Sequence, residues 1–390
     1  MLLVREDAEK NKIERLAEIF FWFGMFCELV VSFSGYAYGG YKEPIIIVLG
    51  MACFCVKILL TAHWKRDLAF FFLLGLYGVA CYHFQNSALI LRIALILLAG
   101  RDMNREKVVK LFFWGTLAVV LVTGILSVLG MHNELYMDGL FRNETERRFC
   151  FGFFHPNGFS FFVFRLLAFG LYLYGKQLRL WQSTVIFCAT FFLILLSNSK
   201  MGIAITLACF IGYCFIKYYK GENRNRIVYY CGNTLFLLEL ILIMISGFFM
   251  KVSYAEMHVE NAGLRFLNEM TSGRLAFVSK TFHEYRPTFF GYRDFMEATE
   301  VGFVNTLYNE GILFFVLYLI ILFWIYRRLY CDNNAGGMLL VLGFSAYSFA
   351  EAFIPYVNKN GVWFMLIGID FISVLLNQWK GRKKHEENQD

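Results

Sequence analysis

The sequence predicts an all-α integral membrane protein, a polytopic bundle of about twelve transmembrane helices that forms a single domain over residues 1–390. Composition is the first reason: 58% of the residues are apolar and 17% are charged, against roughly 45–50% and about 25% in a soluble domain. The chain also has 45 phenylalanines, which water would not solvate. Finally, its apolar runs match the roughly 20 residues that a helix needs to cross a bilayer core.

Taken in order, the apolar runs give the predicted spans. They lie near 16–35, 44–62, 67–84, 86–100, 107–131, 156–175, 183–198, 201–219, 227–250, 303–326, 335–354 and 360–379. The fourth run is short and contains Arg92. Most connections between the runs are short, but two longer polar loops occupy about 132–155 and 251–302.

Basic residues predict the orientation of the bundle. They concentrate in the two ends of the chain and in alternate connections, in seven segments that hold 22 of the 37 Lys and Arg residues. By the positive-inside rule these segments, and therefore both termini, face the cytoplasm. The two long loops are then extracytoplasmic. The net charge of +7 follows from this topology, so it does not indicate a nucleic-acid partner.

The long loops nevertheless contain several basic residues, which the positive-inside rule disfavours on that side. They are Arg142, Arg147, Arg148, Lys251, Arg265, Arg274, Lys280, Arg286 and Arg293. The rule weakens as loops lengthen, so tolerance of charge in a long loop is one interpretation. A functional role for these cations is the other.

The first loop ends in the segment RRFCFGFFHPNG, residues 147–158, which leads directly into a span. Pro156 suits the first turn of a helix, so His155 could simply precede a helix start. Alternatively, Arg148 and His155 lie together at the outer mouth of the bundle. There Arg can bind a phosphate through two parallel hydrogen bonds, and His can exchange a proton near neutral pH.

A tight turn, SNSKMG at residues 197–202, joins two later spans. Its Ser199 and Lys200 could contact a ligand, but a turn with a helix cap explains these residues equally well. A late Glu351 lies near the outer end of the eleventh predicted span.

In the second loop we expect a short amphipathic helix on the outer membrane surface, with Arg274 in its first turn. Thr271 or Ser272 would cap it. Its apolar positions recur at helical spacing, at Leu275, Val278, Phe282 and Tyr285. Glu300 follows, shortly before the tenth span.

Several ionisable residues lie inside predicted spans, among them Glu28, Lys57, Arg92, Arg165, Glu239 and Asp370. Such charges usually face the interior of a bundle and pair with one another. We therefore expect Arg92 and Arg165 to pair with Glu28, Glu239 or Asp370. The alternative is that one of the two arginines lines a groove for a lipid phosphate.

These motifs, in this order and on one predicted side of the membrane, resemble the Wzy-type polysaccharide polymerases of capsule, exopolysaccharide and O-antigen biosynthesis. This family is distantly related to the O-antigen ligases. Its members similarly have an Arg shortly before a Gly-x-x-His-Pro-Asn-like stretch, a Ser-Arg-Thr-Gly-like turn, a Thr-Gly-Arg-like start to the second outer loop, an acidic or His residue before the next span, and a late Glu. The matching residues are Arg148, Gly152, His155, Pro156 and Asn157; Ser199, Lys200 and Gly202; Thr271, Gly273 and Arg274; Glu300; and Glu351.

The resemblance, which runs from about residue 140 to the end, implies a multi-pass glycosyltransferase of the bacterial plasma membrane with its active site outside. It would polymerise oligosaccharide repeat units linked to undecaprenyl pyrophosphate into a cell-surface polysaccharide and release undecaprenyl pyrophosphate. Its partners would be this lipid-linked substrate, membrane lipid, and a chain-length regulator and a flippase. No cofactor is implied.

A pyrophosphate leaving group needs positive charge where its own negative charge develops. The outer loops contain no Asp-x-Asp pair for a divalent metal, so we expect a metal-independent enzyme in which arginine supplies that charge. Arg148 and Arg274 are the expected pyrophosphate-binding catalytic residues, and His155 or Glu300 is the expected base or acceptor-orienting group. Further substrate contacts are expected from Arg147, Asn157, Ser199, Lys200, Arg286, Arg293 and Glu351.

Two other functions fit the same pattern. A lipid-linked oligosaccharide flippase or another secondary transporter could also have twelve spans, although transporters often show two related halves and midplane binding residues. An O-antigen-ligase-like transferase would use the same donor with a different acceptor, and the sequence does not separate it from a polymerase.

Overall fold

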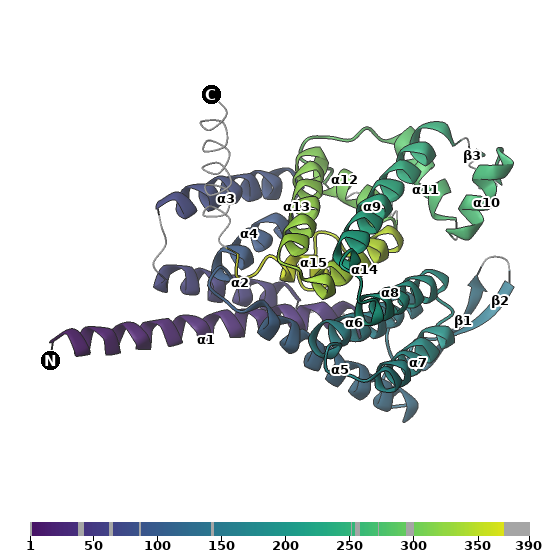
Figure 1. Cartoon of the computed structure of the whole chain (residues 1–390). Helices are drawn as coiled ribbons and strands as arrows, with labels where there is room; N and C mark the ends of the chain where they lie inside the picture. The colour runs from purple at the N-terminus through teal and green to yellow at the C-terminus, as the bar shows by residue number, and fades with distance from the viewer. Residues whose placement is uncertain are drawn as a thin grey trace.

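The computed structural model describes residues 2–37, 43–61, 65–85, 87–141, 144–250, 252–253, 258–271, 273–293 and 300–369 (Figure 1). Its first nine helices are α1 (Leu2–Ala37), α2 (Glu43–Leu60), α3 (Lys65–Gln85), α4 (Leu89–Ala99), α5 (Arg105–Val128), α6 (Pro156–Tyr174), α7 (Leu180–Leu196), α8 (Lys200–Tyr218) and α9 (Arg224–Phe249). The later ones are α10 (Ala262–Met270), α11 (Arg274–Glu284), α12 (Gly302–Asn309), α13 (Gly311–Cys331), α14 (Ala335–Ala350) and α15 (Gly361–Phe364).

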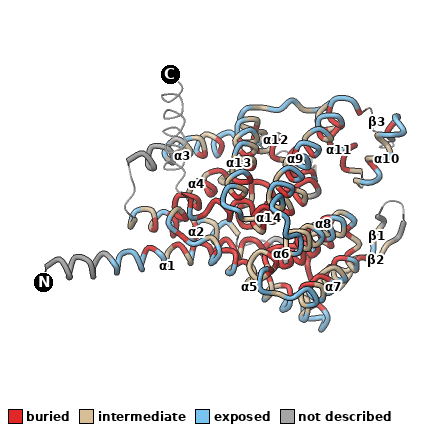
Figure 2. The backbone as a smooth tube through the Cα atoms, viewed as in Figure 1, coloured by how far each residue is buried: buried red, intermediate tan, exposed pale blue. Residues whose placement is uncertain are grey.

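The predicted all-α membrane architecture is confirmed in its coarse form. Seven segments of the described chain are long and apolar enough to cross a membrane, in α1, α2, α5, α6, α8, α9 and α13, and the shorter α4, α7 and α14 are also apolar. Large apolar side chains remain exposed, such as Leu59 at 84% and Phe249 at 74%. Figure 2 shows exposed positions, in pale blue, recurring along the helices. Lipid solvates such a surface, so the chain is a multi-pass membrane protein.

The two ends of the bundle differ. We call one end the loop face; it carries the hairpin β1 (Tyr136–Phe141)–β2 (Glu144–Phe149), the short pair β3 (Val252–Ser253)–β4 (His258–Val259), and α10 to α12. The opposite end, which we call the basic face, carries the turns around 100–105, 175–180, 218–224 and 332–335. The first long loop was predicted without strands, so the hairpin within it is a correction.

The tenth predicted span, 303–326, is also corrected: it is two helices. Gly311 separates α12 from α13 in the left-handed conformation, with φ of +87°. A side chain at this position would overlap the carbonyl oxygen of Phe289, so the segment 288–292 packs directly onto the break. Only glycine tolerates both conditions, and the helix ends there.

The twelfth predicted span, 360–379, is not a continuous helix where it is described. Only Gly361–Phe364 is helical, 365–369 forms turns, and the rest lies outside the described residues. The chain nevertheless runs from Glu351 on the loop face to Gly368, whose N–H donates to the carbonyl of Gly100 (2.8 Å) on the basic face. This irregular segment is largely buried, as backbone without helical hydrogen bonds must be at membrane depth.

Arg165, in the middle of α6, helps to fix this irregular segment. Its fully buried guanidinium donates to the carbonyl oxygen of Asn358 (2.9 Å) and to the hydroxyls of Ser32 (3.0 Å) and Thr116 (2.6 Å). Among the described residues it forms no ion pair with a carboxylate; Asp370, one expected partner, lies outside them. Within the described chain, Arg165 is therefore satisfied by hydrogen bonds.

The expected pairing of Arg92 is confirmed. Its guanidinium lies 2.6 Å from the carboxylate of Glu28, and both side chains are buried between α1 and α4. Burying either charge alone would be costly, so the two helices must pack in this register. Lys57 is likewise paired, with Asp102 at 2.8 Å near the basic face.

The predicted amphipathic helix is present as α11, but its cap and surroundings are corrected. Gly273 is its N-cap, with φ of +84°, whereas the Thr271 hydroxyl donates to the Leu267 carbonyl (3.0 Å) at the end of α10. Asn268 of α10 accepts from the N–H of Ala276 (2.9 Å) in α11 instead. Ser272 lies outside the described residues. The buried side of α11 packs against α9, so protein covers the side expected to face lipid.

Candidate functional site

Five side chains that are distant in the sequence meet on the loop face: Arg148 (β2), Asn157 (α6), Arg274 (α11), Glu300 and Glu351. We call this group the ionic cluster. Arg274 Nη2 lies 2.8 Å from Glu300 Oε2 and 3.9 Å from Glu351 Oε1. Glu300 precedes α12 and Glu351 follows α14, so the cluster joins the hairpin, the bundle and the second loop.

Arg148 is nearly buried, at 7% exposure, because alternation along β2 turns it toward the bundle. Its Nε donates to the Ser197 carbonyl (2.9 Å), and its Nη2 donates to the Asn198 carbonyl (3.2 Å) and to Asn157 Oδ1 (3.0 Å). The two carbonyls belong to the C-terminus of α7, whose dipole favours a cation. They hold the guanidinium in one place.

Asn157 connects the two arginines. It accepts from Arg148 through Oδ1, and its side chain also acts on the carboxyl of Glu351, lowering the pKa of that group; Glu351 in turn faces Arg274. A single amide can do both because it offers an acceptor oxygen and a donor nitrogen. The stretch His155-Pro156-Asn157 therefore contributes Asn157 to the ionic cluster.

His155 has a different role in the local structure. Its Nδ1 accepts from the N–H of Asn157 (3.1 Å), so it is the N-cap of α6, and Pro156 occupies the first turn as expected. Burial, and then the nearby charge of Arg148, lower the pKa of His155 below its ordinary value. The imidazole is therefore neutral at pH 7. Its Nδ1 lone pair is occupied, which leaves Nε2–H as a donor.

The pKa of Glu351 is strongly affected by its position in the ionic cluster. It lies just beyond the last residue of α14, and its side chain is 16% exposed. Burial and then the neighbouring Glu300 raise the pKa of Glu351 to about 8, although Arg274 and Asn157 act in the opposite direction. Near neutral pH its carboxyl is therefore mostly protonated, so the two arginines face mainly one carboxylate, that of Glu300.

Ser199 and Lys200 separate at the start of α8. Ser199 is buried beneath the cluster, and its hydroxyl lies near Gly202, as does that of Tyr347 of α14, which donates to Ser160 (3.2 Å). Gly202 allows this approach, because a side chain there would overlap the Ser160 hydroxyl. Lys200 is exposed at the first helical position.

Three predicted arginines are not brought into the ionic cluster. Arg147 lies on the opposite side of the hairpin, pairs with Asp138 (2.8 Å) and stacks over Tyr136 (4.0 Å). Arg286 and Arg293 are exposed in the segment after α11. The sequence did not indicate Tyr347, Ser160 or the carbonyls of Ser197 and Asn198, because nothing local distinguishes them from ordinary helix and turn residues.

An apolar groove of about 800 Å³ lies between α8, α9 and α14. Its wall is apolar apart from Glu239 and Thr271, and it runs from Phe215 and Ile227 near the basic face to Thr271 near the loop face. At that end its lining residues Met201, Thr271 and Phe349 are each two or three positions from Ser199, Arg274 or Glu351. The groove therefore leads to the ionic cluster.

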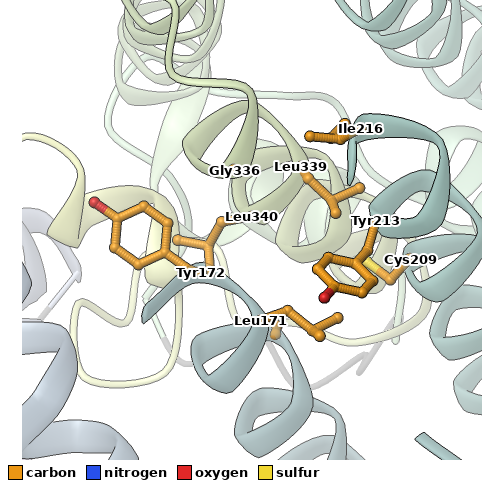
Figure 3. Close-up of a pocket in the computed structure, with 9 residues that line it drawn as sticks. Leu171, Tyr172, Cys209, Tyr213, Ile216, Gly336, Leu339 and Leu340 are labelled. Atoms are coloured by element: carbon orange, nitrogen blue, oxygen red, sulfur yellow. The ribbon is translucent and has the colours of Figure 1, made fainter. Parts of the chain in front are cut away.

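The basic face has its own cavity, of about 990 Å³, which we call the basic-face cavity. Its charged lining residues are Arg105, Glu106, Lys176, Lys217, Arg224 and Asp332. A small apolar pocket of about 30 Å³ lies between this cavity and the groove and shares residues with both (Figure 3). Figure 3 shows Leu171, Tyr213 and Leu339 turned toward one another there. The pocket holds about one water molecule, too little for a ligand.

Within the described residues no group of three or more His, Cys, Asp or Glu side chains is placed to hold a metal ion. The ionic cluster offers two arginines that can bind an anion, with carboxyl groups beside them that can transfer a proton. No family model, curated protein or solved structure matches the chain. The function is therefore inferred from the residues and their geometry.

Proposed function

We propose that the chain is a membrane glycosyltransferase that polymerises oligosaccharide repeat units linked to undecaprenyl pyrophosphate. The reaction would take place at the outer leaflet of a bacterial plasma membrane and build a cell-surface polysaccharide. One observation carries the proposal: two nearly buried arginines lie at the end of a long apolar groove. This arrangement matches a ligand with an anionic head and an apolar tail.

The arginines suit the head group. A pyrophosphate presents several oxygens to guanidinium groups, and cations placed before the reaction stabilise the charge that develops on it. Arg148 is fixed by the end of α7, whereas Arg274 is held by the carboxylate of Glu300, which is 53% exposed. A pyrophosphate could replace Glu300 at Arg274, because the Glu300 side chain is exposed and water can solvate its carboxylate once it is released.

The reaction joins two sugars. The oxygen of an acceptor hydroxyl forms a bond to the anomeric carbon of the donor glycan, and the bond from that carbon to the pyrophosphate oxygen breaks. Undecaprenyl pyrophosphate leaves with the electron pair. The hydroxyl proton passes to a base.

Of the two expected bases, the geometry favours Glu300. Displaced from Arg274 by the substrate, its carboxylate would be available beside the reacting atoms. His155 would need its Nδ1 lone pair, which already accepts the Asn157 N–H (3.1 Å). We assign His155 to positioning α6 and Asn157.

The basic-face cavity supports one alternative, a lipid-linked oligosaccharide flippase. Polar spaces lie toward both ends of the bundle, and the groove approaches each of them, as alternating access would require. An O-antigen-ligase-like transferase is the second alternative, because the same donor site would serve a different acceptor.

Reaction in detergent micelles tests these possibilities. Purified protein is mixed with the lipid-pyrophosphate repeat unit of its host, and the products are sized by gel electrophoresis or mass spectrometry. Micelles have no two sides, so transport cannot appear in this assay. We expect a ladder of repeat multiples.

Unchanged substrate, with the protein shown to be folded and to bind it, would contradict polymerisation. Two further assays then separate the alternatives. Movement of the lipid-linked repeat between the leaflets of a vesicle indicates the flippase, and transfer of the glycan to an added second acceptor indicates the ligase.

A further inference from the structure

A second, smaller polar cavity lies on the loop face beside the ionic cluster. Its volume is about 270 Å³, and we call it the polar cavity. Its polar lining comes from the end of α3, the segment after α11, α12 and the start of the 351–369 segment, through Gln85, Ser87, Tyr292, Asn305, Asn309, Glu310 and Tyr356. None of the functions assigned above uses these residues.

Unsatisfied polar atoms gather around this cavity. Gln85 and Glu310 are 5% and 3% exposed, yet Gln85 Oε1 and Glu310 Oε2 have no hydrogen-bond partner among the described residues. Of the eight such buried side-chain atoms in the described chain, these two line the same cavity. Folded proteins satisfy the large majority of buried polar groups, so this pair of atoms indicates a place where a polar ligand is bound.

The polar groups that line the cavity indicate which class of ligand it can bind. Amides from Gln85, Asn305 and Asn309, with the Ser87 hydroxyl and the Glu310 carboxyl, offer donors and acceptors side by side. Among the described residues that line the cavity there is no lysine, arginine or histidine, so this lining does not favour an anion. A sugar matches this mixture, because each hydroxyl both donates and accepts, and its C–H face can lie against a tyrosine ring.

The cavity is rigidly connected to the ionic cluster through α12. This helix begins two residues after Glu300, and Asn305, Asn309 and Glu310 follow along it or directly after it. At its start, Gly302 packs so closely that a side chain would overlap the carbonyl of Glu351. An eight-residue helix is about 12 Å long, so sugars held in the cavity remain within reach of the cluster.

We propose that the polar cavity is a saccharide subsite that holds a sugar ring of the acceptor repeat unit, so that its hydroxyl is presented to the anomeric carbon at the ionic cluster. The volume suits part of a glycan rather than a whole repeat unit, because ligands of drug size occupy about 300–1,000 Å³. This inference rests on the proposed transferase function, but the subsite binds free saccharide whether or not transfer occurs.

Binding of free saccharide tests the subsite. The probe is the repeat-unit oligosaccharide of the host polysaccharide, prepared free of lipid and phosphate, and added to the full chain in lipid nanodiscs. Binding is followed by saturation-transfer NMR and calorimetry. The main variant is Asn305→Ala with Asn309→Ala; both side chains are partly exposed, so truncation leaves no buried void. Asn225→Ala on the basic face is the matched control.

We expect the Kd for the saccharide to rise about tenfold or more in the double variant, since two hydrogen-bonding amides are lost, and to stay unchanged in Asn225→Ala. Ala352→Trp, which places a large ring at the cavity wall, should have the same effect. Equal binding by wild type and the cavity variants would overturn the subsite, and so would wild-type protein that does not bind the probe.

A separate variant distinguishes failure of the subsite from failure of the proposed function. Arg274→Ala removes a cation of the ionic cluster but no group of the cavity, so it should bind the free saccharide as wild type does. Saccharide binding without any repeat ladder would keep the subsite and reject the polymerase. A ladder from wild-type protein with an unchanged acceptor KM in the cavity variants would reject the subsite alone.

Discussion

Lys217 and Arg224 at one end of the bundle and Arg274 at the other are held by different kinds of partner. On the basic face, Lys217 donates to the carbonyls of Gly175 (2.8 Å) and Leu178, and Arg224 donates to that of Ile216 (3.2 Å). On the loop face, Arg274 faces the side-chain carboxylate of Glu300 (2.8 Å). A backbone carbonyl at a helix end cannot turn away without unwinding the helix, whereas a side chain can. The carboxylate at Arg274 can therefore be exchanged for a substrate anion, whereas the carbonyls at Lys217 and Arg224 cannot.

Removing the cations tests this difference most strongly. We expect Arg274→Ala or Arg148→Ala to lower the rate of repeat transfer about 10²–10³-fold, because each removes charge stabilisation of the leaving pyrophosphate. Arg274→Lys should recover part of the rate, since lysine keeps the charge but not the two parallel hydrogen bonds. The measurement is the initial rate of ladder formation.

Lys217→Ala is the control at the other end and should leave the rate nearly unchanged, because Lys217 lies at the opposite end of the bundle from the ionic cluster. A ladder that forms at the wild-type rate in both arginine variants would contradict the assignment of the ionic cluster, though not polymerisation itself.

Glu351 gives the ionic cluster a pH dependence. With a pKa of about 8, its carboxyl is mostly neutral at pH 7 and gains a negative charge as the pH rises, 3.9 Å from Arg274. That charge opposes a bound pyrophosphate. We expect the Kd for undecaprenyl pyrophosphate to rise about tenfold between about pH 7 and about pH 9. Calorimetry in nanodiscs measures it.

The matched variant for this prediction is Glu351→Gln, which keeps the shape but cannot ionise. Its Kd should remain nearly constant over the same range. A wild-type Kd that does not change with pH, or the same rise in the variant, would show that Glu351 does not control binding.

Two variants of His155 distinguish a structural role of this residue from a catalytic one. Asparagine is also a good N-cap, so His155→Asn should keep stability and most of the transfer rate, whereas His155→Ala should lose about 1 kcal/mol of stability. Thermal unfolding and ladder rates measure the two effects. A general base would instead lose about 10²–10⁴-fold in rate in both variants, and that result would restore His155 as the base.

The smallest effect is expected at Arg147, the neighbour of Arg148 on the other side of the hairpin. It is exposed and paired with Asp138 in solvent, so Arg147→Ala should change the transfer rate by less than about twofold. A large loss at this position would mean that charge anywhere on the hairpin matters, rather than charge directed into the cluster.

The sequence predicted much of the site because its motifs fall at helix ends. Arg148, Asn157, Arg274, Glu300 and Glu351 were all expected to act on one side of the membrane, and the structure brings them within one cluster. Alternation along β2 turns Arg148 rather than Arg147 toward the bundle, and the sequence did not predict the hairpin that contains this strand. His155 was identified, but its engagement as a helix cap depends on backbone geometry that residue type does not reveal.

Composition and the length of apolar runs by themselves determined that this is an all-α membrane protein, because the cost of exposing apolar side chains to water, or bare backbone to lipid, depends on local sequence alone. Local patterning also located most helices. Tertiary structure alone decided the break at Gly311, the irregular crossing of 351–369, the pairing of Arg92 with Glu28, and the polar cavity. Each of these depends on which segments lie side by side, since a glycine, a buried charge or an unpaired amide has its effect only through neighbours from distant parts of the chain.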